Sequence, residues 1–263
     1  GPDYIDPMFH KKVLGVPSKN LDTFFTDEKT TVQLFLDERA DGDFAVLEGV
    51  MGLYDGLGGI YEQGSSYHLA KVTQTPIILV VDAKGMGKSV LALIAGFLQY
   101  DTHHLIKGVL LNRMSKGYYD IIKPLIEKEL SVKVVGYFPE QNDIGLSSRH
   151  LGLVMPDELS DIKKQLNETA DRLKKTIDMD LFIDIAEAAD EIGDSGSADA
   201  YNEKNIGNCD QNEFLQNKAI NTVNIAVAMD EAFCFYYEDN LRMLEKCGAK
   251  LRFSLLLCKF SRP

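Results

Sequence analysis

The sequence predicts an α/β fold built on a doubly wound, mostly parallel sheet. Short apolar runs without polar alternation are typical of strands buried on both faces. Such runs lie at 44–48, 76–81, 107–111 and 132–138. Helix candidates separate them, at 27–40, 65–74, 88–100 and 117–130. Strands that alternate with helices favour parallel pairing with right-handed crossovers.

The second half of the chain changes character twice. Apolar residues recur every three or four positions from Leu159 to Ile177, which predicts an amphipathic helix after Pro156. Residues 191–222 are poor in large apolar side chains and rich in Gly, Asn, Asp and Ser, as in a linker. A strand at 222–233 and a helix that starts at 236 and is closed by Gly248, with the start of a further strand after it, then begin another α/β unit. We therefore predict a domain at 1–190, a linker at 191–222 and an incomplete second domain at 223–263.

Composition narrows the classes of function. The 263 residues are 45% hydrophobic and carry a net charge of -12, with a pI near 4.9. This acidic balance disfavours nucleic acid and anionic membranes as partners, because both need a basic face. No apolar run approaches the length of a membrane span. All four cysteines lie in the last quarter without a CxxC pair, which favours a reducing, cytoplasmic location.

A distinctive residue stands at the end of each predicted strand. Glu48, Asp82, Asn112 and Pro139 stand at four strand ends, and open α/β sheets bind ligands beyond the carboxyl ends of their strands. In "LEGVMGLYDG", glycines accompany Glu48 and Asp55. Such a loop lets the backbone approach a phosphate while carboxylates hold Mg²⁺, a cation that prefers oxygen ligands. The alternative, which the spacing leaves open, is that Glu48 caps a turn and Asp55 with Gly56 forms a tight reversal.

Two further patterns argue against chemistry of their own. "DAKGMGKS", residues 82–89, lacks the first glycine of a phosphate-binding loop, so we predict that Gly87 and Ser89 simply start a helix. All five histidines precede residue 151 and every cysteine follows residue 208, so no thiolate–histidine pair is apparent. Cys234, in "FCFYY", fits a small buried hydrophobe.

Several motifs together resemble one enzyme family. "GPDYIDPMFH", "NLD", "LEGVMGLYDG", "GVLLNR", "RHLGLV" and "AMDEAFCFYY" are similar, in this order, to motifs of the cobyrinic acid a,c-diamide synthase family. The resemblance extends from residue 1 to about residue 250. It implies a P-loop, dethiobiotin-synthetase-like amidoligase domain that lacks its first strand and P-loop, followed by the start of an α/β glutaminase domain.

The resemblance also implies an activity. Members of the family use ATP and glutamine to amidate the a and c side-chain carboxylates of cobyrinic acid, in cobalamin biosynthesis. This chain is then expected to be a partial or inactive fragment of such a ligase. The alternatives are amidation of nickel sirohydrochlorin, or a non-catalytic module of degenerate nucleotide fold that binds a tetrapyrrole or a partner.

Finally, the resemblance implies roles for individual residues. Glu48 would bind Mg²⁺, and the substrates would be ATP, glutamine and cobyrinic acid or a related tetrapyrrole. No nucleic acid or membrane partner is expected, and a homo-oligomer is compatible with the resemblance. The catalytic residues would be Asp3, Tyr4, Asp6 and Asp55. Nucleotide contacts would come from Asn112, Arg113 and Pro139. Substrate contacts would come from Asn20, Asp22, Arg149 and His150.

Overall fold

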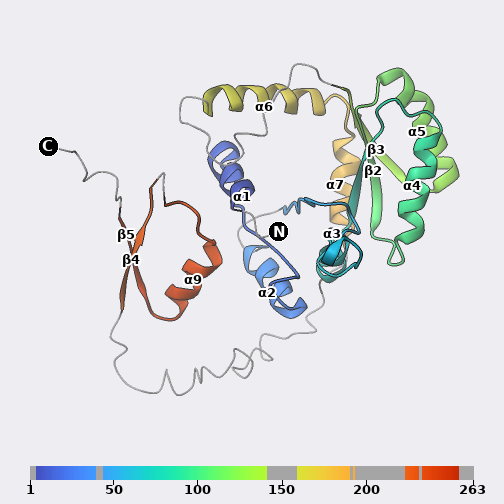
Figure 1. The fold of residues 1–263 in the computed structure, drawn as a ribbon. Helices are drawn as coiled ribbons and strands as arrows, with labels where there is room; N and C mark the ends of the chain where they lie inside the picture. Colours follow the sequence, from blue (N-terminus) through green and yellow to red (C-terminus); the bar gives the residue numbers. More distant parts are fainter. Residues whose placement is uncertain are drawn as a thin grey trace.

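Two parallel sheets and their helices make up the described part of the chain (Figure 1). This computed structural model describes residues 4–39, 44–140, 159–189, 192, 223–230 and 233–254. The first sheet has the order β1-β2-β3, and the second pairs β4 with β5. The strands are β1 (Ile77–Asp82), β2 (Ile106–Asn112), β3 (Lys133–Phe138), β4 (Asn224–Ala228) and β5 (Lys250–Ser254). An α/β fold with parallel sheets is therefore confirmed.

The first sheet is aligned at its carboxyl end. Asp82 at the end of β1 lies opposite Asn112 at the end of β2, and Asn112 lies opposite Phe138 at the end of β3. Parallel neighbours point the same way, so the residues that follow all three strands emerge along one edge of the sheet.

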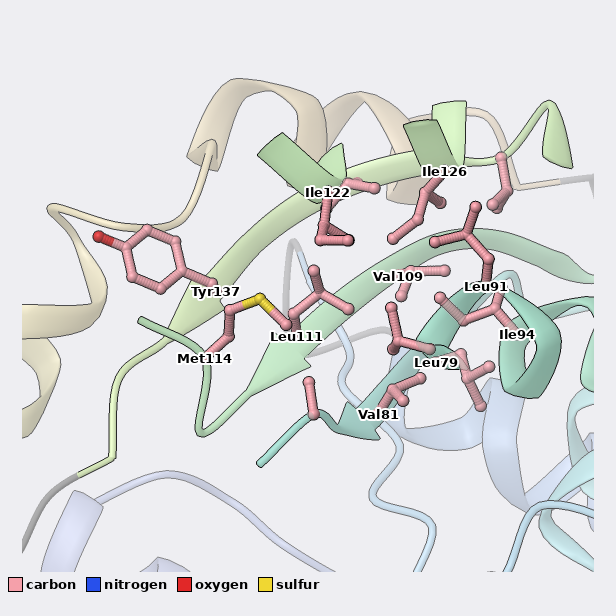
Figure 2. Close-up of a cluster of buried hydrophobic side chains, with 14 of the residues drawn as sticks. Leu79, Val81, Leu91, Ile94, Val109, Leu111, Met114, Ile122, Ile126 and Tyr137 are labelled. Carbon is pink, nitrogen blue, oxygen red and sulfur yellow. The ribbon is translucent and has the colours of Figure 1, made fainter. Parts of the chain in front are cut away.

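The main core lies between this sheet and the helices α4 (Ser89–Tyr100) and α5 (Lys116–Leu130). Figure 2 shows the labelled side chains of Leu79, Val81 and Val109 meeting those of α4 and α5. The side chains that are fully buried here include Val109, Leu111, Ile94, Ile126 and Val134. Each fully buried aliphatic side chain stabilises the fold by about 1.5–3 kcal/mol.

On the opposite face of the sheet, α7 (Met179–Glu187) packs over β2 and β3. Ile185 of α7 lies over Gly108 of β2, where an added Cβ would stand 3.0 Å from the Ile185 side chain. Glycine at position 108 therefore allows the helix to approach the sheet closely. Helices therefore lie on both faces of the sheet, with α4 and α5 on one face and α7 on the other, while Val80 of β1 stays exposed beside α7.

The segment that joins α6 (Leu159–Leu173) to α7 runs along the outer edge of β3. Tyr137 donates its backbone N–H to the Thr176 carbonyl at 3.2 Å, and Asp178 donates to the Val135 carbonyl at 2.8 Å. Gly136 permits this contact, because a Cβ there would collide with the Thr176 backbone. The helix predicted to continue to residue 177 is therefore shorter. Helix α7, which the sequence analysis missed, begins where Asp178 accepts the Leu181 N–H.

The remaining helices lie outside the first sheet. They are α1 (Ile5–Phe9), a π-helical turn (His10–Leu14), α2 (Glu28–Arg39), a 3₁₀ turn (Leu57–Gly59), α3 (Ser66–Val72) and α9 (Glu238–Lys246).

The second sheet forms a small parallel unit in which α9 connects β4 to β5. Helix α9 lies within the range predicted for it but is shorter than expected. The linker predicted at 191–222 lies outside the described residues apart from Ile192, and the domain boundaries remain a prediction. Among the helices described, none is both long and apolar enough to cross a membrane.

The strand predicted at 44–48 is wrong for this structure. These residues form neither helix nor strand, and the Val46 side chain is 75% exposed. An apolar run becomes a strand only when a neighbour supplies the hydrogen-bond ladder, and none of the strands in the described ranges pairs with it. Apolar composition alone could not reveal whether a pairing partner was present.

A buried polar network joins α3 to the turn between α4 and β2. Tyr67, fully buried, donates its hydroxyl hydrogen to Asp101 Oδ1 at 2.8 Å. The Asp101 carboxylate, 3% exposed, also accepts the backbone N–H groups of Leu105 at 2.9 Å and Ile106 at 2.7 Å. A buried carboxylate is tolerated only when its oxygens are hydrogen-bonded, so this network fixes the entry into β2.

We predict that Tyr67→Phe destabilises the protein by about 1.5–3 kcal/mol, the usual contribution of a hydrogen bond to a charged group. The ring keeps its packing, but the buried carboxylate loses one donor. Urea unfolding measures the effect, and Tyr61→Phe, at a tyrosine that is 61% exposed, is the matched control. Equal stabilities for the two variants would contradict the role given to the network.

Candidate functional site

Charged side chains cross-link the carboxyl edge of the first sheet. The Arg113 guanidinium, just after β2, grips the carboxylate of Asp82 at the end of β1 through two nitrogens, with Nε 2.7 Å from Oδ1. Lys84, just after β1, pairs with Glu140, which follows β3 and Pro139. The ends of all three strands are thus joined by two ion pairs. Asp82 is predicted from the sequence as a strand end, whereas the pairing of Lys84 with Glu140 depends on the fold and is not.

Arg113 adopts a left-handed backbone conformation, with φ of 58°. Residues other than glycine rarely adopt it, and the strain costs about 1–3 kcal/mol. Asn112 Oδ1 accepts the Arg113 N–H at 3.0 Å, which supports the turn from within. Because the Asn112 amide oxygen is used in this way, its NH₂ group is the part that can donate to a ligand.

The pair also sets the ionisation of Asp82. Hydrogen bonds from the Arg113 guanidinium and from the Lys84 backbone N–H hold the pKa of the Asp82 carboxyl below its usual value of 3.8. In turn, the hydrogen bond to Asp82 raises the pKa of Arg113. Both side chains are largely exposed, so the pair orients the guanidinium rather than stabilising the fold.

The glycines of "LEGVMGLYDG" serve the packing of the loop itself. A Cβ at Gly52 would collide with the Asp55 carboxylate, and one at Gly56 would collide with the carbonyl oxygens of Tyr61 and Gln63. Asp55 also donates its N–H to the Gly52 carbonyl at 3.0 Å. Asp55 therefore closes a tight turn, as in the turn alternative above, while its side chain stays exposed. This geometry leaves its proposed metal role untested.

Glu48 lies next to the N-terminal segment, residues 4–19. Its Oε2 is 3.4 Å from His10 Nε2, and the other ring nitrogen of His10 is 3.1 Å from Ser18 Oγ. The Glu48 side chain remains 62% exposed. His10 was missed by the sequence analysis, because nothing in its local pattern indicates a partner so far along the chain.

The other predicted site residues are only partly brought together. Asp6 lies in α1, and Tyr4, just before α1, stacks on Tyr237 with ring centroids 4.3 Å apart. Asp22 Oδ1 accepts the Phe24 N–H at 2.7 Å in the connection to α2, shortly after Asn20. Asp3, Arg149 and His150 lie outside the described residues, so their predicted roles receive no structural account.

The segment 82–89 starts a helix, as predicted. Gly85 makes a left-handed turn, α4 begins at Ser89, and the Lys88 ammonium lies 3.3 Å from Glu129 of α5. Within the ranges that the structure describes, no group of three His, Cys, Asp or Glu side chains converges as a metal centre. The exposed carboxylates of Glu48 and Asp55 nevertheless supply the hard oxygen ligands that Mg²⁺ takes, often only one or two from protein.

Comparison with known proteins agrees with the motifs. The chain is 37% identical over 259 residues to a cobyrinate a,c-diamide synthase of Clostridium tetani, covering 98% of this chain and 54% of that protein. It is 38% identical to the enzyme of that name from Thermoplasma acidophilum, covering 96% of this chain and 53% of the relative. This chain is a relative of the cobyrinate a,c-diamide synthases. The resemblance inferred from its motifs is thereby confirmed.

The match covers nearly all of this chain but only about half of each relative. A cobyrinate a,c-diamide synthase of Listeria innocua shows the same pattern, with 35% identity over 95% of this chain and 52% of the relative. The chain thus spans about half the length of the curated relatives it matches. No family model matches the chain, and no solved structure matches it.

The ion pair at the sheet edge predicts an acid titration. The Asp82 pKa is depressed, so its contact with Arg113 is complete above about pH 4 and is lost as the pH falls through the folded value. Carboxyl-carbon NMR should give Asp82 a midpoint below 3.8, and Arg113→Gln should move it upward. Lys84→Gln, which leaves the guanidinium in place, should move it less. An unshifted midpoint in Arg113→Gln would contradict the pairing.

Proposed function

We propose that this chain takes part in the ATP- and glutamine-dependent amidation of the a and c side-chain carboxylates of cobyrinic acid. The observation that carries the proposal is its similarity, over nearly its whole length, to proteins named cobyrinate a,c-diamide synthase. Residues 1–190 would belong to the amidating part and residues 223–263 to the start of a glutaminase part. We place the activity in the cytoplasm.

The reaction must activate a carboxylate before ammonia can displace its oxygen. ATP transfers its γ-phosphoryl group to a carboxylate oxygen of the ring, which gives an acyl phosphate and ADP. Ammonia from glutamine attacks the acyl carbon, the carbon–oxygen bond to phosphate breaks, and the proton that the nitrogen loses leaves with the phosphate, so that an amide and hydrogen phosphate result. The protein has to align these groups and stabilise the negative charge that develops.

The cross-linked sheet edge would bind the nucleotide. Asn112 offers its NH₂ group, and Arg113 is held in place by Asp82. Lys84 adds a second positive charge beside Glu140. A guanidinium and an ammonium are the side chains that bind phosphate groups, as a planar fork and a point charge respectively. Pro139 contributes apolar surface where β3 ends.

The acid-bearing loop, residues 47–56, and the N-terminal segment, residues 4–19, would form the part of the site where the phosphoryl transfer takes place. Glu48 and Asp55 would hold Mg²⁺ through their exposed oxygens, as the donor chemistry allows. When bound, Mg²⁺ neutralises charge on the phosphates during transfer. His10 lies within 3.4 Å of Glu48 and would orient its carboxylate. Tyr4 and Asp6 would lie near the acceptor carboxylate, with Asn20 and Asp22 nearer the ring.

In the intact enzyme, the substitution Glu48→Gln tests the amidation directly. We expect a loss of about a hundredfold or more in amidation rate, because the charge that holds the metal is removed. The assay supplies ATP, Mg²⁺, glutamine and cobyrinic acid, and mass spectrometry counts the amides formed. Because Glu48 is exposed, thermal unfolding should be little changed. The matched control is Glu62→Gln, at a carboxylate of comparable exposure that pairs with Lys71.

Separate arms identify the step and the substrate. Ammonium in place of glutamine bypasses the glutaminase, and nickel sirohydrochlorin in place of cobyrinic acid tests the other macrocycle. Near-normal turnover of Glu48→Gln at saturating Mg²⁺ would overturn its assignment. Binding of cobyrinic acid without amide formation in any arm would favour the non-catalytic binding module.

A further inference from the structure

The N-terminal segment, residues 4–19, contacts the beginning of α9 at several points. Tyr4 stacks on Tyr237 at 4.3 Å with an interplanar angle of 24°, and its ring lies 5.6 Å from that of Phe235. The Lys11 ammonium is 3.5 Å from Glu238 Oε2, and the Lys19 ammonium is 3.6 Å from Asp239 Oδ1. We call this set of contacts the end-to-end contact.

The end-to-end contact is built from consecutive residues on the C-terminal side. Tyr237 is the residue just before α9, and Glu238 and Asp239 are in its first turn, where negative charge is favoured. All three contact the same N-terminal segment. From that segment, Lys11 and Lys19 lie beside the two carboxylates and the Tyr4 ring stacks on Tyr237. The contact therefore combines ring packing with opposite charges.

Lys19 indicates that the contact is more than a surface ion pair. Its side chain is only 11% exposed, and its ammonium also donates to the backbone carbonyl of Leu34 in α2. A shielded ammonium is tolerated when such hydrogen-bonding and charged partners surround it. Lys19 therefore ties α2 and α9 together at one point, in the region where Figure 1 shows α2 between the two sheets.

The same N-terminal segment reaches Glu48 through His10. It is thus held at Tyr4, Lys11 and Lys19 by α9 and its preceding residues, and at His10 by the acid-bearing loop. We infer that Tyr237 is a positioning residue, which acts through Tyr4 to hold the segment so that His10 stays beside Glu48. The importance of Glu48 rests on the proposed function, whereas the contact itself does not.

Hydrogen exchange of the whole chain tests this inference without an activity assay. In Tyr237→Ala we expect the backbone amides of residues 5–14 to exchange about two- to tenfold faster, the range for the loss of one aromatic pair. The amides of β2 and α5 should be unchanged. Tyr237→Phe keeps the ring and should restore protection, which a loss of overall stability would not predict. Tyr61→Ala, at an exposed tyrosine outside the contact, is the control.

A second set of variants keeps the inference decidable if Tyr237→Ala loosens the whole chain. Lys11→Glu should speed exchange in residues 5–14, and the double variant Lys11→Glu with Glu238→Lys should reverse this. Unchanged exchange there in Tyr237→Ala, or no reversal in the charge swap, would overturn the inference. If the exchange rates change as expected but the protein makes no amide, the proposed function is contradicted and the inference about Tyr237 is not.

Discussion

Parallel pairing of β1, β2 and β3 is the constraint on which the rest of the described structure depends. The pairing sets Asp82 level with Asn112 and Asn112 level with Phe138. A shift of one residue in the register of any of these strands would move its apolar side chains to the other face of the sheet. It would also separate the polar side chains at the strand ends. Burial of Leu79, Val109 and Val134 against α4 and α5 therefore fixes the core and the edge at once.

The site combines a rigid part with a part that depends on distant contacts. At the sheet edge, Arg113 and Lys84 stand on strand ends and are oriented by carboxylates from other strands. Glu48 instead lies on a segment without a strand, and its described contact is with His10. Preorganised groups are the more effective in stabilising developing charge. The sheet edge is therefore the part best suited to hold the proposed nucleotide, and the N-terminal segment is the part whose position needs support.

Much of the fold could be predicted from sequence, because local pattern determined it. The apolar runs and their spacing placed three of the four strands predicted for the first domain, and the helices between them, to within one or two residues. The run at 44–48 failed because its pairing is not a local property. Helix α7 was missed although Asp178 is a local N-cap signal, because the apolar spacing from Leu159 to Ile177 suggests one helix that runs through the turn along β3.

The candidate site was less predictable for the same reason. Asp82 and Asn112 could be expected at one edge, because the carboxyl ends of parallel strands must meet there. The pairs Lys84–Glu140, His10–Glu48 and Tyr4–Tyr237 join residues that are remote in sequence, and no periodicity reports them. The glycines near Asp55 suggested a phosphate, yet in the fold they give room to the loop's own backbone and carboxylate.

The most direct test of the central claim is the amide NMR spectrum of the chain during titration with magnesium ATP at up to about millimolar concentration. If the aligned strand ends bind the nucleotide, the largest shifts will fall on Lys84, Asn112, Arg113 and Glu140, with the core amides of α5 unmoved. Shifts confined to β4, β5 and α9, or a spectrum that does not change, would contradict the account.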